Sequence, residues 1–475
     1  MTANSKQSAS GLRQQCLSFP EVLAQSVATI VPTATPSVNI ALVFASAGNG
    51  TWLAYVIATI GLVLVSLNIN QFARRSASPG SLYSYISRGL GPTAGVISGW
   101  SLFLAYLCAA MVVLCAFASY TNVVLGEFGF HFSPILLYAV CAGVSWYYAY
   151  TDIQLSAILM LILELASVSL ISILAVIVLF GRGFTIDTSQ ILLEGVSSEG
   201  LRLGLVLAVF SYIGFESATA LGDEAKNPLR SIPKSVILST VLSGLFFILL
   251  SYTEVLAFSN YKTPLNKTDA PLSVVANLAG VNLLGIAISG AITFSFLAAT
   301  IASINAAARI FFSMARHGIF HSSIGQAHKK NETPHVAVNL STLFAFLVPA
   351  SISLFGIRDL DIYGYLGSIG AYGFLLVYIM VSVAAPVYLH RKGKLRPANV
   401  VIAALAVLFM LIPVFGSLYP VPPFPYNVFP YLFLMYLVVG GGWFLILSLR
   451  SPQTIEHMER DLEAVHSRFS DTEVG

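Results

Sequence analysis

Three carboxylic side chains lie within long apolar stretches of this 475-residue chain, at Glu164, Glu216 and Glu254. A charge at the centre of a bilayer costs ~2.5–3.5 kcal/mol even on a lenient scale, so a carboxylate at that depth indicates a function. No Lys or Arg occupies the middle of these stretches to neutralise it. We therefore interpret Glu216 and Glu164 as groups that meet a proton or a cationic substrate, and we place Glu254 near the membrane interface.

Two of the apolar stretches are interrupted near their midpoints by residues that break helices. Pro32 and Pro36 stand in the first stretch, and Gly214 stands close to Glu216 in a later one. Proline removes an N–H donor and clashes with the carbonyl four residues back. Freed backbone groups are tolerated in a membrane only inside protein or beside a watery cavity. Half-helix ends offer N–H groups to an anion and carbonyls to a cation, which matches the two charges of an amino acid.

The composition requires a bilayer around most of the chain, because 56% of the residues are hydrophobic and only 9% are charged, against roughly 25% charged in soluble domains. Runs of about 20 apolar residues can cross the hydrocarbon core. Such runs centre on twelve positions: Ile30, Ile60, Ala105, Ala142, Ser167, Tyr212, Phe246, Phe296, Phe344, Val377, Val407 and Met435. The two breaks fall in the first and sixth spans, a pattern typical of transporters built as inverted repeats with the substrate between the broken helices.

The Lys and Arg residues are distributed unequally between the two sides of the predicted membrane. When the N-terminus is placed in the cytoplasm, 19 of the 24 basic residues fall on the cytoplasmic side, as the positive-inside rule requires. Both termini are therefore expected in the cytoplasm. After Arg450, the spacing of Ile455, Met458, Leu462 and Val465 is compatible with a short amphipathic helix on the membrane surface or with a solvated tail.

Other classes of function lack the residues that they need. The 24 basic and 21 acidic residues nearly cancel and form no long run, so no nucleic acid is expected as a partner. The four cysteines show no metal-ligand spacing, and the eight histidines lie in loops, at span ends or in the tail. We expect no catalytic residues, no metal site and no cofactor, and an integral-membrane enzyme is the less favoured alternative.

Several motifs are similar to those of one transporter family. The stretch FSYIGFESA at 210–218, followed by GDEAKNPLRSIP at 222–233, resembles the sixth span and the following loop of the amino acid–polyamine–organocation (APC) permeases. Further agreement comes from PGSLY at 79–83 and from Asn305 and Arg309 near the end of the eighth span. The resemblance extends from about residue 20 to residue 340, and the last spans agree mainly in hydropathy.

The resemblance implies an all-α integral membrane protein with about twelve transmembrane helices. Its core is a five-plus-five inverted repeat with broken first and sixth helices, and two further helices are peripheral. The corresponding segments are a cytoplasmic tail at 1–19, repeats at 20–180 and 201–390, the peripheral pair at 398–450 and a cytoplasmic tail at 451–475.

The resemblance also implies roles for residues at both breaks. In the family, a Gly-x-Gly-like triplet in the first span binds the substrate carboxylate through its amides. Ala34, Thr35 and Pro36 occupy that place here, and the hydroxyls of Thr33, Thr35 and Ser37 can supply donors instead. The implied roles in the sixth span are an aromatic wall or gate for Phe210, backbone contacts to the ammonium for Ser211, Ile213 and Gly214, and either coupling or substrate sensing for Glu216. Some relatives carry a lysine in the fifth span, where Glu164 is the only ionisable residue here.

We therefore expect a secondary active transporter that moves amino acids or related amines by alternating access, with the proton as coupling ion. Exchange, uniport and sodium coupling stay open, since Thr300 and Ser303 of the eighth span carry oxygens that can ligate a hard cation. The expected location is the plasma membrane, which is the inner membrane of a bacterial cell. The expected partners are the small-molecule substrate and the lipid bilayer, with the protein as a monomer or a homodimer.

Overall fold

The computed structural model describes residues 10–259, 261–268, 270–451, 458 and 460. Apart from one isolated bridge, the regular structure of these residues is helical, because only helices satisfy the backbone of a single span in lipid. The helices in chain order are α1 (Phe19–Ile30), α2 (Ile40–Ala47), α3 (Thr51–Ala73), α4 (Ser81–Leu90), α5 (Pro92–Gly126), α6 (Pro134–Thr151), α7 (Ile153–Gly181), α8 (Thr188–Ile191), α9 (Ser198–Phe210), α10 (Pro228–Phe258), α11 (Pro271–Leu278), α12 (Asn282–Arg316), α13 (His335–Ser353), α14 (Asp359–Arg391), α15 (Pro397–Gly416) and α16 (Phe429–Arg450). The predicted amphipathic helix of the C-terminal tail falls mostly outside the described residues.

Within the described chain, nine stretches are long and apolar enough to cross a membrane. The difference from the twelve predicted spans has three sources. The stretch Phe19–Ala73 contains two predicted spans, α1–α2 and α3. The helix α6 is long enough, but its four tyrosines and one tryptophan make it less apolar than the other spans. The sixth predicted span is broken after α9. All twelve predicted centres lie in helices except Tyr212, which lies in that break.

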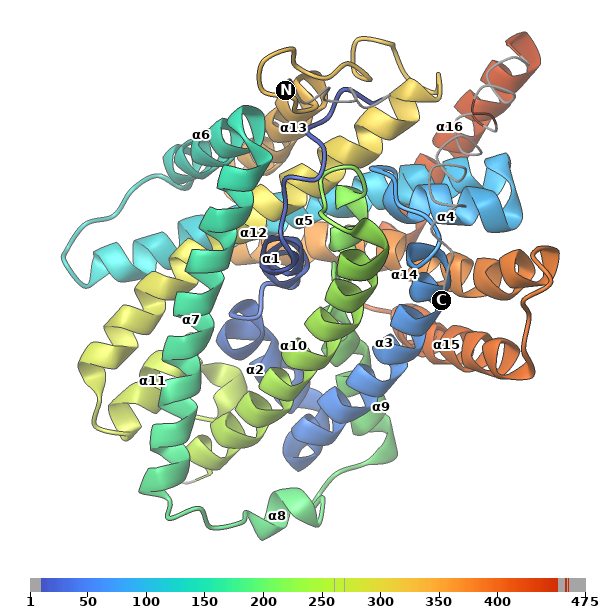
Figure 1. Ribbon diagram of the computed structural model, residues 1–475. Helices are drawn as coiled ribbons and strands as arrows, with labels where there is room; N and C mark the ends of the chain where they lie inside the picture. The colour runs from blue at the N-terminus through green and yellow to red at the C-terminus, as the bar shows by residue number, and fades with distance from the viewer. Residues whose placement is uncertain (1–9, 260, 269, 452–457, 459, 461–475) are drawn as a thin grey trace, which may run out of the picture.

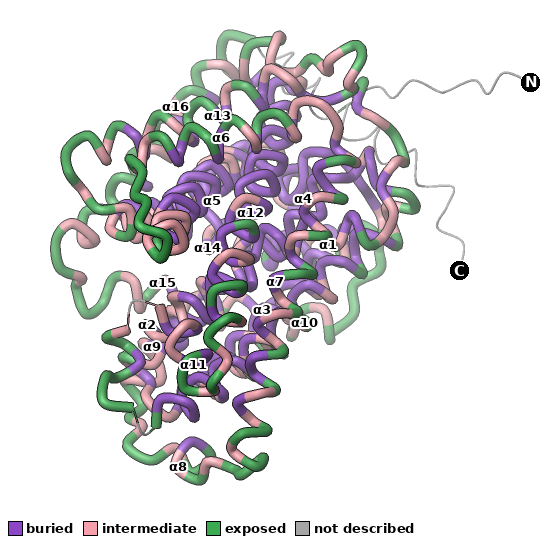
Figure 2. The backbone as a smooth tube through the Cα atoms, turned by 90° about the vertical axis from the view of Figure 1, so that its left-hand side faces the viewer, coloured by how far each residue is buried: buried purple, intermediate pink, exposed green. Residues whose placement is uncertain are grey.

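The broken first span lies at the centre of the molecule. Figure 1 shows α1 between the long helices α7 and α10, which it contacts, while α2 packs mainly against α9. The helices α5, α12 and α14 pack closely together, and Figure 2 shows that buried residues concentrate around them while the exposed residues lie at the periphery. The two breaks are therefore surrounded by protein on most sides, which is the environment that an interrupted helix needs in lipid.

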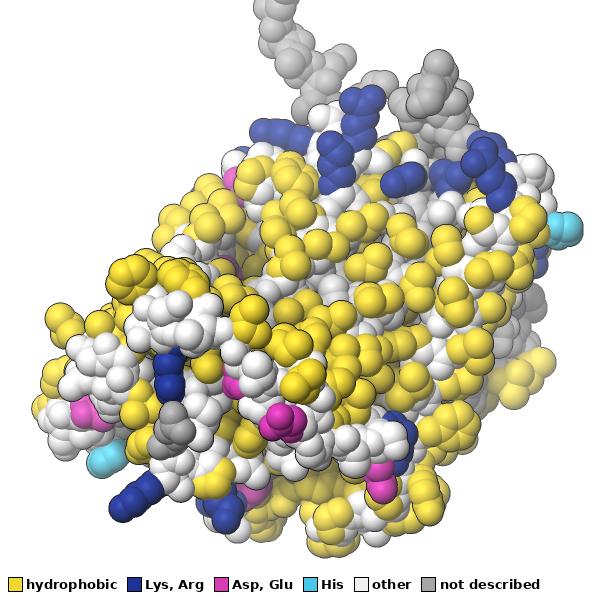
Figure 3. All heavy atoms as spheres, turned by 90° about the horizontal axis from the view of Figure 1, so that it is seen from below, with side chains coloured by type: hydrophobic (Ala, Val, Ile, Leu, Met, Phe, Trp, Pro, Cys, Tyr) yellow, Lys and Arg dark blue, Asp and Glu magenta, His cyan; other side chains and the backbone are white. Residues whose placement is uncertain are grey.

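The outer surface of the bundle is apolar. Figure 3 shows a wide band of hydrophobic side chains, with Lys and Arg side chains gathered along its upper edge and others scattered at the opposite end. Large apolar side chains such as Ile162, Leu165 and Val438 are more than half exposed. An apolar band of this extent fits a lipid environment, and the basic edge agrees with the charge asymmetry of the sequence.

The end of the bundle that carries the N-terminal segment is closed by backbone and charge contacts. Leu17 pairs with Ala225 in an isolated parallel bridge, and the Arg13 guanidinium lies 2.6 Å from the Asp152 carboxylate. The carboxylate of Glu224 accepts hydrogen bonds from Nε and Nη2 of Arg309 at 2.9 and 2.7 Å.

The burial of this ion pair differs from the sequence interpretation. The positive-inside count places Arg309 with the cytoplasmic loops, but the residue lies inside α12 with an exposed fraction of 1%. Arg309 can be buried in α12 because the carboxylate of Glu224 neutralises its guanidinium within the protein.

The orientation generates a test by cysteine labelling. In a background without Cys16, Cys108, Cys115 and Cys141, we expect Arg230→Cys to resist a membrane-impermeant maleimide in intact cells and to react after permeabilisation. The side chain of Arg230 is exposed at the end of the bundle that carries the N-terminal segment. The charge asymmetry of the sequence predicts that this end faces the cytoplasm.

The matched control is Lys262→Cys, an exposed position between α10 and α11 at the opposite end. This cysteine should react in intact cells. Rapid labelling of Arg230→Cys together with protection of Lys262→Cys would reverse the orientation.

Candidate functional site

The first span breaks because its helical hydrogen bonding stops before two prolines. The helix α1 ends at Ile30, and Val31 takes a left-handed conformation with φ 54°. The chain then forms a π-helical turn from Thr35 to Asn39 before α2 begins. The hydroxyl of Thr35 is fully buried and has no hydrogen-bond partner among the described residues. The hydroxyl of Thr33 is engaged, because it donates to Ser295 Oγ of α12 at 2.8 Å.

The sixth span breaks at a glycine that no other residue can replace without strain. The helix α9 ends at Phe210, and the chain passes through turns before a short 3₁₀ helix, η3 (Ser217–Leu221). Gly214 has φ +94°, and a Cβ atom placed on it would lie 2.4 Å from Thr29 Cγ2 of α1. The glycine therefore permits both the backbone turn and the close approach of α1.

The two breaks satisfy part of each other's hydrogen bonding. The N–H of Ala218 donates to Ser26 Oγ at 3.0 Å, and the hydroxyl of Ser217 donates to the carbonyl of Gln25 at 3.1 Å. Within the described part of the chain, the carbonyl oxygens of Ser211 and Ile213 accept no hydrogen bond. These two carbonyls are acceptors that a cation can use.

Glu216 lies beneath the break, fully buried between two phenols. The hydroxyl of Tyr106 in α5 donates to Oε1 at 2.6 Å, and the hydroxyl of Tyr378 in α14 donates to Oε2 at 2.5 Å. The N–H of Gly214 in turn donates to the Tyr378 oxygen at 3.2 Å. Sequence reasoning did not identify either tyrosine, because each lies in an unbroken apolar span and no local pattern marks it.

Glu164 is linked to the first break through a serine. Its Oε1 accepts a hydrogen bond from Ser295 Oγ at 2.8 Å, and the same Ser295 oxygen accepts from Thr33. Its Oε2 has no hydrogen-bond partner in the described residues. The side chain also faces an apolar pocket of about 190 Å³ that contacts α1, α7 and α10. Glu164 therefore combines an internal hydrogen-bond relay with one free oxygen.

The prediction for Glu254 is wrong. The sequence places this residue near the membrane interface, whereas its exposed fraction is 1%. Neither carboxylate oxygen has a hydrogen-bond partner within the described ranges. The helix α10 continues past Glu254 to Phe258 and is covered there, which keeps the side chain inside the bundle.

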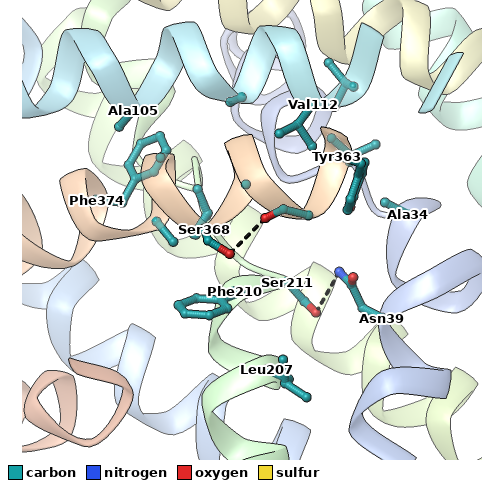
Figure 4. Close-up of a pocket in the computed structure, with 18 of the residues that line it drawn as sticks. Ala34, Asn39, Ala105, Val112, Leu207, Phe210, Ser211, Tyr363, Ser368 and Phe374 are labelled. Atoms are coloured by element: carbon teal, nitrogen blue, oxygen red, sulfur yellow. Dashed lines mark hydrogen bonds between the residues drawn. The ribbon is translucent and has the colours of Figure 1, made fainter. Parts of the chain in front are cut away.

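A cavity of about 370 Å³ lies between the two breaks and the helices α5 and α14. In Figure 4, Leu207 and Phe210 approach from α9, and Ala105 and Val112 approach from α5. Of the residues predicted to contact the substrate, Ala34, Phe210, Ser211 and Ile213 line this cavity. Thr33, Thr35, Gly214 and Glu216 are not among its lining residues and lie behind it.

The residues considered for sodium binding, Thr300 and Ser303, both lie in α12. The hydroxyl of Thr300 donates to the carbonyl of Phe296 and accepts from Cys141 Sγ of α6. The hydroxyl of Ser303 is buried without a partner among the described residues. No group of three or more His, Cys, Asp or Glu side chains in the described chain is arranged to hold a metal ion.

Two relatives of known function are similar to this chain in sequence. The branched-chain amino acid permease BcaP of Bacillus subtilis (strain 168) is 26% identical over 397 residues, which are 77% of this chain and 80% of that protein. The low-affinity putrescine importer PlaP of Escherichia coli (strain K12) is 27% identical over 307 residues, which are 62% of this chain and 66% of the importer.

The fold is similar to that of a solved membrane transporter. A Na⁺-coupled sialic acid symporter in a substrate-bound outward-open state superposes with a TM-score of 0.57 and 13% identity, over 88% of this chain and 93% of that chain. This likeness confirms the predicted all-helical membrane fold. The model of the amino acid permease family matches residues 21–451. The chain therefore belongs to the amino acid permease family of multi-pass membrane transporters, as its sequence motifs predicted, and it is not an enzyme.

Proposed function

We propose that this permease is a proton-coupled secondary transporter whose substrate binds in the cavity between the two broken helices. The observation that carries the proposal is the meeting of both breaks at one cavity, together with two buried carboxylates, Glu164 and Glu216, that form no ion pair with a Lys or Arg of the described residues. The names of the relatives, a branched-chain amino acid permease and a putrescine importer, support an amino acid or an amine as substrate. The proposed location is the plasma membrane with both termini in the cytoplasm.

The substrate ammonium is assigned to the sixth-span break. The free carbonyls of Ser211 and Ile213 supply acceptors there, and both residues line the cavity. The substrate carboxylate is assigned to the first-span break, where Ala34 lines the cavity and the hydroxyl of Thr35 has no partner among the described residues. A half-helix end attracts a charge of opposite sign to its own partial charge.

The proton is assigned to Glu164, to Glu216 or to both. Hydrogen bonds link Glu164 through Ser295 to Thr33 at the first-span break. Protonation of Glu164 can therefore alter the hydrogen bonding at that break. Glu216 is connected to the sixth-span break through Tyr378 and Gly214. Among the described residues each carboxylate accepts hydrogen bonds from hydroxyl groups only, and neither lines the cavity, so its charge at membrane depth has to be neutralised by a proton.

The structure is closed at one end, as alternating access requires. The N-terminal segment and the Glu224–Arg309 ion pair close the end that we place in the cytoplasm. The cavity extends in the other direction to Tyr363 in the first turns of α14 and to Tyr426 in the loop after α15. We therefore assign this structure to a state in which the substrate enters from the side opposite the termini.

The close contact at Gly214 generates the first test of this site. We expect Gly214→Ala to abolish substrate-dependent thermal stabilisation, because the methyl group would clash with Thr29 Cγ2 and a non-glycine residue in this conformation costs roughly 1–3 kcal/mol. The measurement is a thermal-shift panel of amino acids and polyamines on the purified protein.

Two further variants separate loss of binding from loss of folding. Thr29→Ser added to Gly214→Ala removes the clashing methyl group and keeps the hydroxyl that donates to Gln25, so it should restore part of the stabilisation. Gly181→Ala, at the end of α7 with no described atom within 4 Å of the added Cβ, should behave as wild type. Full stabilisation of Gly214→Ala by substrate would place the site elsewhere.

The carboxylates generate the second test, by uptake into proteoliposomes under an imposed pH gradient. A gradient of one pH unit is worth ~1.4 kcal/mol per proton, which supports about tenfold accumulation at one proton per substrate. We expect Glu216→Gln or Glu164→Gln to remove this accumulation while equilibrium exchange of substrate persists, because glutamine cannot carry the proton.

Glu199→Gln, an exposed change at the start of α9, is the matched control and should keep the full response. Accumulation driven by a sodium gradient and indifferent to pH would establish sodium coupling instead. Uptake that requires substrate on the other side and ignores both gradients would establish exchange.

A further inference from the structure

The part of the cavity away from the two helix breaks has no charged lining. Its wall comes from α5, α9 and α14, and Ala109, Val112, Leu207, Gly367 and Phe374 are among the contributors. No Asp, Glu, Lys, Arg or His is among the residues that line the cavity in the described chain. A charged side chain placed in this region would lose its water without gaining an ionic partner, whereas an apolar side chain gains from leaving water.

Three polar side chains of the lining, those of Asn39, Ser368 and Thr29, already donate hydrogen bonds within the protein. Asn39 Nδ2 donates to Ser211 Oγ at 3.2 Å, and the Ser368 hydroxyl donates to the carbonyl of Gly364 at 2.8 Å (Figure 4). The hydroxyl of Thr29 donates to the carbonyl of Gln25 at 2.7 Å. These donors are committed to protein acceptors, so they do not favour a polar substrate side chain.

The carboxylate of Glu216 also has its hydrogen-bond partners within the protein. Both oxygens of Glu216 accept hydrogen bonds from phenols, and the residue has no exposed surface. The ring of Phe374 lies edge-on to that of Tyr106, with ring centroids 5.1 Å apart, and Phe374 itself lines the cavity. An aromatic layer therefore separates the cavity from the carboxylate that could otherwise bind a second ammonium group.

One glycine of α14 leaves room in the cavity that packing does not require. A Cβ atom on Gly367 would meet Val112 Cγ2 at 3.7 Å, which is ordinary contact. By contrast, a Cβ atom on Gly370 would lie 2.8 Å from Cys108 Cβ, so that glycine is needed for α5 and α14 to approach. The space in front of Gly367 is bounded by Val112, and a larger residue at position 367 would take volume from the cavity.

We propose that the cavity selects amino acids with an uncharged apolar side chain, and that Gly367 and Val112 set the largest side chain it accepts. This inference rests on the proposed function, because it assigns the substrate class of the same site. It excludes diamines and amino acids with charged side chains as preferred substrates.

The first experiment is competition against uptake of radiolabelled leucine in proteoliposomes. Uptake should be inhibited by valine, isoleucine, methionine and phenylalanine at concentrations comparable with that of unlabelled leucine. The same inhibition by lysine, glutamate or putrescine should require at least tenfold higher concentrations. Tighter binding of putrescine or lysine than of leucine would overturn the inference and leave amine or amino acid transport intact. Failure of every amino acid and amine to enter would instead remove the proposed function.

The second experiment changes the size of the site. Gly367→Ala should weaken the binding of phenylalanine and leucine by about tenfold or more relative to that of alanine. One methylene in a tight pocket changes discrimination between substrates by roughly 10–200-fold. Val112→Ala should shift the preference in the opposite direction, towards phenylalanine. Gly441→Ala in α16, where the added Cβ meets no described atom within 4 Å and which does not line the cavity, should leave the preference unchanged.

The ratio of inhibition constants between phenylalanine and alanine is the quantity to compare. An equal loss for all amino acids in Gly367→Ala would indicate a general packing defect and would overturn the role of Gly367 in size selection. An unchanged ratio in both Gly367→Ala and Val112→Ala would place the side-chain pocket elsewhere.

Discussion

The absence of water from the bilayer core is the constraint on which the rest of this structure depends. Backbone groups released by a broken helix must find partners inside the protein, and here the two breaks find them largely in each other. Ser26 accepts from the N–H of Ala218, and Ser217 donates to the carbonyl of Gln25. The carbonyls of Ser211 and Ile213 remain unpaired among the described residues, and both residues line the cavity. The constraint that holds the broken helices together therefore also defines where a charged substrate can bind.

Buried carboxylates are stabilised in two different ways in this molecule. Glu224 has the guanidinium of Arg309 at 2.7 Å, so its charge is neutralised by a fixed cation at the closed end of the bundle. Glu216 and Glu164 are bonded by hydroxyl groups of Tyr106, Tyr378 and Ser295. A fixed cation removes the need for a proton, whereas hydroxyl partners leave the carboxylate to be neutralised by a mobile proton. The chemistry of the partners thus separates a structural carboxylate from two candidates for coupling.

Small residues of α14 serve both packing and the cavity. Gly370 and Gly373 lie against Cys108 and Ser101 of α5, where a Cβ atom would approach within 2.8 and 2.6 Å, so these glycines let two central helices meet. Gly367 lies on the same helix but faces free volume. Close packing on both sides of the cavity gives it rigid walls, and rigid walls are what allow a single methyl group to change which side chain fits.

The sequence alone determined the membrane fold, the family and the positions of both breaks. Apolar runs of spanning length, Pro32, Pro36 and Gly214 act locally, so their consequences can be predicted without knowing what packs against them. Only the tertiary structure decided which side chains meet. Tyr106 and Tyr378 lie 272 residues apart in the chain and share one carboxylate, Ser295 links Glu164 to Thr33, and Glu254 is buried rather than interfacial. These contacts join helices distant in sequence, and hydropathy measures only how apolar a segment is, not which of its faces is turned towards another helix.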